Sequence, residues 1–196
     1  MSYDAKHRRP VLQGPRCKWD GGPRSTADIS WIVWHTTEGG GYPRQPSALA
    51  VARWGAAWVP ADHKVSWHLV VDDSVAIVTL PDDVISYTAF SRANRHGLHI
   101  ELAGHARWST LEWYRHQATL KRAAWRAALW CRRYDIPPRF LTDDEYRRGD
   151  KGMITHAQVT RVDRVGSHTD PGPRFPARRV ARMVRRRLET LAGARE

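Results

Sequence analysis

Residues 31–36 of this chain read Trp-Ile-Val-Trp-His-Thr, and three consecutive glycines follow at positions 39–41. A short apolar run that is bounded by glycines predicts a β-strand ending in a turn. His35 stands near the end of this run. The stretch therefore predicts a strand that carries an imidazole at its carboxyl end.

The segments that follow this strand predict an α/β fold. Further strands are predicted at residues 66–71, 75–80 and 98–103, the first two of which form a hairpin. Helices are predicted at residues 47–54, 109–134 and 177–191. Ser47 is the expected N-cap of the first helix, and the Ser-Thr-Leu-Glu sequence at 109–112 is a capping box for the second. Strands followed by helices indicate one α/β domain with a central mixed β-sheet flanked by α-helices.

The length and composition fit a single folded domain. A chain of 196 residues that is 41% hydrophobic can bury one core. Residues 1–28 are rich in Pro, Gly, Arg and Lys and predict an irregular N-terminal arm, so that residues 29–196 form the domain. No apolar run approaches the roughly 20 residues that span a bilayer. Residues 1–10 are polar and basic, so we expect no secretory signal and synthesis in the cytoplasm.

The charge of the chain indicates anionic partners. The formal net charge is +12 and the sequence pI is about 10.5. Such a charge governs partners rather than fold, and nucleic acid and the anionic polymers of a cell envelope are both candidates. The basic segments contain no recognised nucleic-acid-reading motif, which disfavours a specific nucleic-acid partner. The two cysteines, Cys17 and Cys131, exclude a disulfide scaffold, and we expect two free thiols.

Two segments late in the chain predict a metal site. Residues 155–159 read Thr-His-Ala-Gln-Val and residues 166–173 read Gly-Ser-His-Thr-Asp-Pro-Gly-Pro, so Gly and Pro prevent one continuous helix. A catalytic zinc ion needs three protein ligands and one open position for water. His35, His156 and Asp170 supply such a set. Each residue alone is more typical of a surface or hydrogen-bonded group, and it is their combination that favours zinc.

Two more residues are candidates for catalysis. Glu101 alternates with apolar residues in the strand predicted at 98–103. Such a carboxylate is often simply solvated, but beside a zinc-bound water it is the usual general base for amide hydrolysis. His168 stands two residues before Asp170 and is therefore held near the metal, where it is able to stabilise an oxyanion.

Several motifs together resemble a known family. They are residues 32–39, 66–70, 94–104, 154–158, 170–173 and 175–176, in that order along the chain. The sequence resembles the type 2 N-acetylmuramoyl-L-alanine amidases, a zinc amidase superfamily that includes peptidoglycan recognition proteins and bacteriophage endolysins. The resemblance covers roughly residues 30–190. The motifs are specific for the family only when they are taken together. It implies the α/β fold of the peptidoglycan recognition proteins.

The resemblance also implies roles for individual residues. Zinc would be bound by His35, His156 and Asp170, and Glu101 would activate the water. His168 stands where many members have a lysine that polarises the scissile carbonyl, which would make that role sensitive to pH.

Three further residues are implied to contact substrate: Thr36, Trp67 and Asn94. Trp67 replaces a catalytic tyrosine of one branch of the family, which favours the branch that uses the glutamate. Asn94 either positions substrate or caps a turn.

The expected function is zinc-dependent hydrolysis of the amide between N-acetylmuramic acid and L-alanine in peptidoglycan. Because no secretory signal is expected, a phage or prophage endolysin that reaches the wall during lysis fits better than a secreted enzyme. We expect a monomer. Anionic cell-envelope polymers are expected to attract its basic surface and so assist its delivery to the wall. The alternatives are a non-catalytic peptidoglycan-binding module and, on charge alone, a nucleic-acid-binding protein.

Overall fold

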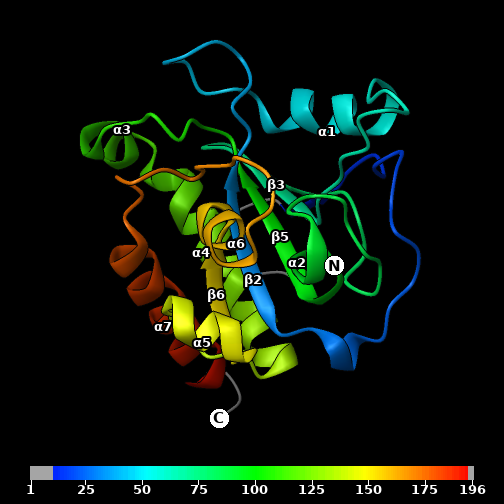
Figure 1. The fold of residues 1–196 in the computed structure, drawn as a ribbon. Helices are drawn as coiled ribbons and strands as arrows, with labels where there is room; N and C mark the ends of the chain where they lie inside the picture. Colours follow the sequence, from blue (N-terminus) through cyan, green and yellow to red (C-terminus); the bar gives the residue numbers. More distant parts are fainter. Residues whose placement is uncertain (1–10, 194–196) are drawn as a thin grey trace.

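The computed structural model describes residues 11–193, so the first ten residues of the predicted arm lie outside the described part. Its centre is a six-stranded mixed sheet of order β1-β4-β3-β5-β2-β6 (Figure 1). The strands are β1 (Val11–Gln13), β2 (Trp31–Thr36), β3 (Leu69–Val71), β4 (Ala76–Val78), β5 (Gly97–Leu102) and β6 (Gly152–Thr155). Only β3 and β4 are antiparallel; the remaining pairs are parallel. The predicted α/β class is confirmed.

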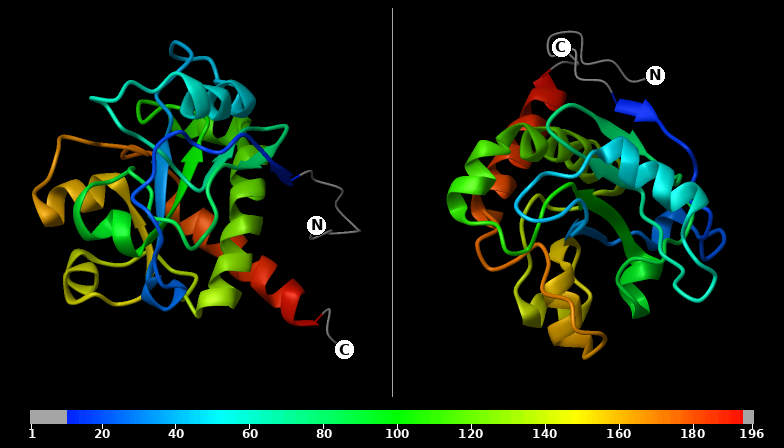
Figure 2. Two further views of the ribbon diagram at one scale, coloured as in Figure 1. Left: turned by 90° about the vertical axis from the view of Figure 1, so that its right-hand side faces the viewer. Right: turned by 90° about the horizontal axis from the view of Figure 1, so that it is seen from above.

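Helices cover both faces of this sheet. They are α1 (Ala48–Ala57), α2 (Ser91–His96), α3 (Thr110–Arg115), α4 (Gln117–Tyr134), α5 (Asp143–Arg148), α6 (His156–Asp163) and α7 (Ala177–Gly193). In the left view of Figure 2, α4 and α7 lie on one side of the sheet and α2, α5 and α6 lie on the other. None of the described helices is both long and apolar enough to cross a membrane.

Alternation along β2 decides which side chains reach which face. Ile32 and Trp34 point into the main core, where they pack against α4 and α7. Trp31 and Val33 point to the other face and join a smaller cluster with α2, α5 and α6. His35 continues this second series, so the strand directs its imidazole to the face opposite α4 and α7.

The helix predicted at 109–134 is interrupted, which corrects the prediction. The capping box at its start is confirmed, but α3 ends at Arg115 and α4 begins at Gln117. Asp73, in the turn between β3 and β4, contacts His116 at 2.6 Å and accepts a hydrogen bond from the backbone N–H of Thr119 at 2.9 Å. Asp73 thus satisfies a backbone N–H in the first turn of α4, where the N-cap residue His116 makes no side-chain capping bond. A cap from another segment leaves no local sequence signal.

The segment expected to be an irregular arm is partly ordered against the domain. Val11–Gln13 pairs with β4, and Thr26–Asp28 forms a 3-10 helix. Arg24 is buried, and its guanidinium donates hydrogen bonds to the carbonyl oxygens of Asp82 and Gly97 at 2.8–3.0 Å. Two short segments within residues 11–28 are therefore regular, and the boundary of the arm at residue 28 stays a prediction.

Both cysteines are buried and free. Cys17 packs in the cluster beneath α1, whereas Cys131 belongs to α4 and the main core on the other side of the sheet. This arrangement agrees with the expected pair of free thiols.

Candidate metal centre

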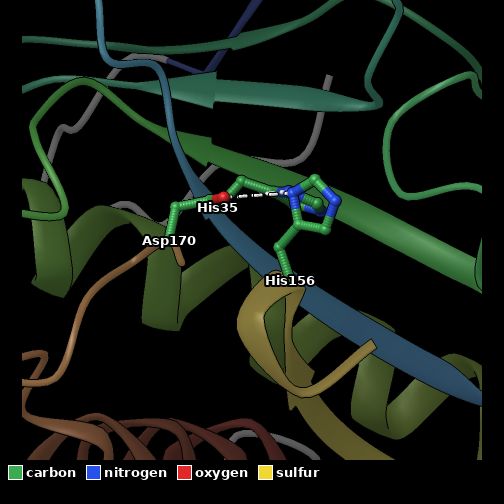
Figure 3. A group of neighbouring side chains, drawn as sticks. All are labelled: His35, His156 and Asp170. Atoms are coloured by element: carbon green, nitrogen blue, oxygen red, sulfur yellow. Dashed lines mark hydrogen bonds and ion pairs between the residues drawn. The ribbon is translucent and has the colours of Figure 1, made fainter. Parts of the chain in front are cut away.

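Three segments that are distant in sequence meet at the carboxyl end of β2. His35 is the penultimate residue of β2, and His156 is the first residue of α6, directly after β6. Because β6 runs parallel to β2, both strands end at the same edge of the sheet. Asp170 comes from the loop between α6 and α7 and points at the two imidazoles (Figure 3). The predicted set is thus brought together.

The distances within this group fit a small tetrahedral metal ion. His35 Nδ1 lies 3.1 Å from His156 Nδ1 and 3.3 Å from Asp170 Oδ2. His156 Nδ1 lies 3.1 Å from Asp170 Oδ1. Two ligands that bind a tetrahedral zinc ion at about 2.0–2.1 Å lie about 3.3–3.4 Å apart. These buried donors are therefore able to hold a metal ion, and their chemistry suits zinc.

The electrostatics of the group favour the metal-binding protonation states. Burial lowers the pKa of His35 to about 4, so its imidazole is neutral near pH 7. Burial raises the pKa of Asp170, but its contacts with the imidazoles of His156 and His35 outweigh this effect and leave that pKa well below its usual range. A neutral imidazole and an ionised carboxylate are the forms that coordinate a metal.

Glu101 lies beside this group with one oxygen unpaired. It is the direct neighbour of His35 across the β2–β5 pairing. Its side chain is buried, and Oε2 has no hydrogen-bond partner among the described residues. Burial raises the pKa of Glu101 well above its usual range, and the charges of Asp170 and Glu38 raise it further. A buried, unpaired carboxylate oxygen in this position is suited to accept a proton from a bound water.

His168 lies against the outer side of the group formed by His35, His156 and Asp170, as predicted from its spacing. Its ring stacks on that of His156 with centroids 3.9 Å apart, and its Nδ1 is 3.8 Å from Asp170 Oδ1. Its side chain is 45% exposed, so it is accessible from solvent. Burial, followed by the neighbouring His156, lowers the pKa of His168.

Of the predicted substrate contacts, Thr36 lies closest to the ligands. Its backbone N–H donates to Asp170 Oδ2 at 3.3 Å, and its hydroxyl donates to Glu38 Oε1 at 2.5 Å. Both interactions hold the site together. A contact between Thr36 and substrate stays a prediction.

The other two predicted substrate residues make structural contacts. Asn94 Oδ1 accepts hydrogen bonds from the backbone of Thr88 and Ala89 at 2.9 and 2.7 Å, which is the turn-capping alternative. Trp67 is buried and stacks on Trp54 of α1 at a centroid distance of 6.2 Å. Substrate contacts for both residues stay predictions.

Two histidines outside the predicted site prove to be linked to it. His99 Nδ1 lies 3.0 Å from His35 Nε2, and the ring of His68 stacks on that of His99. Burial lowers the pKa of both rings, that of His68 to about 3. His99 stands two residues before Glu101 in β5 and therefore shares its face of the sheet, but nothing in the sequence indicates its contact with His35.

The mixed β-sheet carries at its edge a buried His-His-Asp group and an unpaired glutamate. These features make the protein a candidate metal-dependent hydrolase. Residues 25–173 match the model of the N-acetylmuramoyl-L-alanine amidase family, and the chain belongs to this family. This membership supports amidase activity on peptidoglycan. A search of curated protein sequences finds no significant match.

Several solved structures share the fold at low sequence identity. The hydrolase AmiA of Staphylococcus aureus, solved with its ligand, is 16% identical and superposes with a TM-score of 0.71 over 96% of this chain and 88% of its own. An AmpD derivative is 18% identical, with a TM-score of 0.62 over 94% of this chain and 99% of its own. A mutant endolysin from Bacillus subtilis is 15% identical, with a TM-score of 0.60 over 90% and 99%.

Proposed function

We propose that this protein is a zinc-dependent amidase that cleaves the bond between N-acetylmuramic acid and L-alanine in peptidoglycan. One observation supports this most strongly: three metal donors 3.1–3.3 Å apart lie beside an unpaired buried glutamate in a chain of the amidase family. Zinc held by His35, His156 and Asp170 would polarise the scissile carbonyl and lower the pKa of a bound water.

The remaining chemistry belongs to the side chains around the metal. Glu101 accepts a proton from the attacking water and passes it to the departing amine of L-alanine, which completes the hydrolysis. Burial and the nearby carboxylates raise its pKa, which favours uptake of a proton from the water. His168 donates a hydrogen bond from its partly exposed ring to the developing oxyanion.

The test is hydrolysis of purified peptidoglycan by the zinc-loaded protein. We expect new α-amino groups of L-alanine to appear without new reducing sugar ends, and a chelator to abolish the reaction until zinc is restored. Zinc content is measured on the same preparation. Binding to peptidoglycan without release of amines would instead identify a non-catalytic binding module.

We further propose that the enzyme acts as a phage or prophage endolysin. The similarity of fold to a Bacillus subtilis endolysin supports this role. Lysis of intact host cells is compared for protein that is added outside the cells and for the same amount of protein expressed inside them. The comparison tests whether a membrane lesion is required for access to the wall.

A cationic groove on the far side of the sheet supports an anionic wall polymer as a second partner. The groove, of about 530 Å³, lies between α4 and α7 and is lined by five cations: Lys121, Arg179, Arg182, Arg186 and Arg187. None of these forms a salt bridge with a described carboxylate. Helix α4 contains no acidic residue and α7 contains only Glu189. A polymer held here leaves the catalytic face free.

Removing charge from the groove is expected to slow wall lysis selectively. In an Arg182→Gln/Arg186→Gln variant we expect lysis of intact walls to fall several-fold at low salt, because such attraction is screened over about 8 Å at physiological ionic strength. Turnover of a small soluble muropeptide should not change. Rates on both substrates across a salt series measure the difference.

The matched control is Arg53→Gln/Lys64→Gln, which removes the same charge from exposed positions in and beyond α1. Equal losses in both double variants would show that net charge matters and the groove does not. Equal losses on walls and on muropeptide would assign the arginines a structural role.

A further inference from the structure

A line of three buried imidazoles runs from the metal-binding group into the centre of the sheet. His35 Nε2 lies 3.0 Å from His99 Nδ1, and His99 Nε2 lies 3.0 Å from the carbonyl oxygen of Ala93. Directly before β3, His68 Nδ1 accepts a hydrogen bond from the backbone N–H of His99 at 3.1 Å. His68 and His99 are fully buried, and His35 nearly so.

The partners of His99 determine where its proton lies. A carbonyl oxygen only accepts hydrogen bonds, so the contact with Ala93 requires the proton of His99 on Nε2. In the neutral ring, Nδ1 then carries a lone pair and accepts a hydrogen bond from His35 Nε2. His35 in turn has its proton on Nε2 and a bare Nδ1, and this Nδ1 faces His156 and Asp170.

Neighbouring residues hold His99 in this orientation. A side chain at position 97 would place its Cβ 2.8 Å from His99 Nε2 and 2.5 Å from the Ala93 oxygen, so Gly97 leaves the space that the bond occupies. The ring of His68 stacks on that of His99 at 5.8 Å, and His68 Nε2 is in turn fixed at 3.0 Å from the carbonyl oxygen of Val84.

We propose that His99 is a positioning residue for the metal site, because it holds His35 in the Nε2–H tautomer. The Nδ1 atom of His35 then carries no hydrogen, so it is ready to bind the ion even in the metal-free protein. The inference rests on the proposed role of His35 as a ligand. Partners of this kind orient metal-bound imidazoles, and their loss typically costs about 10- to 100-fold in metal affinity.

The first test needs neither a variant nor a metal. Long-range ¹H–¹⁵N spectra of the metal-free wild-type protein report which nitrogen of each imidazole carries hydrogen. We expect both His35 and His99 to be protonated on Nε2 alone. A hydrogen on Nδ1 of His35 would overturn the inference, whether or not the protein proves to be an amidase.

The second test compares two substitutions of His99. Gln retains one acceptor and one donor, whereas Leu retains neither. Competition with a chromophoric chelator should show zinc affinity about 10- to 100-fold weaker in His99→Leu and closer to wild type in His99→Gln. His96→Gln is the matched control, because His96 contacts the Asp28 carbonyl at the same end of β5 and not the ligands.

The outcomes separate this inference from the proposed function. Wild-type zinc affinity in a folded His99→Leu protein would overturn the positioning role and leave the amidase intact. Equal loss of affinity in the Gln and Leu variants, with intact folding by circular dichroism, would also overturn it. If His99→Leu does not fold, the wild-type spectra still decide the question. Wild-type protein that binds no zinc would contradict the proposed function instead.

Discussion

Glu101→Gln is expected to yield a folded, zinc-loaded protein that hydrolyses muropeptide about 10²- to 10⁴-fold more slowly than wild type. Glutamine keeps the size of the side chain and one oxygen beside His35, but it does not accept the proton of the attacking water. Since Glu101 is not one of the three proposed ligands, zinc content and affinity for muropeptide should be near those of wild type. Turnover, bound zinc and substrate binding are measured on one preparation.

Glu38→Gln is the control for this substitution. It makes the same chemical change in a carboxylate near the site, but Glu38 is 47% exposed and already accepts hydrogen bonds from Thr36 and Ala106. We expect a much smaller loss of turnover. Near-wild-type turnover in Glu101→Gln would exclude it as the base and make His168 the next residue to test.

Substituting any one of the three proposed ligands should remove zinc and activity together. His35→Ala, His156→Ala and Asp170→Ala each leave two donors, which hold the ion weakly. The two histidine variants also remove an imidazole that contacts the buried carboxylate of Asp170. Elemental analysis after dialysis and amine release from peptidoglycan measure the two losses.

His168→Ala provides the contrast within the same loop. Its ring stacks on His156, yet it is not part of the ligand set, so this variant should keep zinc and lose part of its activity. Stoichiometric zinc in the His156→Ala protein would remove that histidine from the site. Loss of zinc from the His168→Ala protein would show that His168 belongs to the ligand set.

The sequence predicted elements whose signals are local. Strand β2 has glycines beyond its end, and α3 begins with its capping box. The three proposed metal ligands could also be selected from the sequence, because their residue types and family motifs do not depend on knowing the packing. Helix α6 was not predicted, since its eight residues and the four of β6 before it are too short for a clear periodicity.

What could not be predicted depends on partners far along the chain. Asp73 accepts its hydrogen bond from Thr119, at the start of α4, across 46 positions of sequence. The contact between His35 and His99 joins residues 64 positions apart. Strand β1 pairs with residues about 65 positions further on, with Val11 opposite Ala76. In each case the deciding interaction exists only after the sheet has formed.

The pairing of β1 with β4 has a consequence for association between copies of the chain. An unpaired strand edge is a template for association with other chains, and native sheets commonly end in a short or polar strand that prevents this. Here the three residues of β1 occupy the edge of β4, whose Ala76 and Ile77 are buried. A shortened protein that begins at residue 29 would present that apolar edge to solvent, and strand-to-strand aggregation would then compete with correct folding.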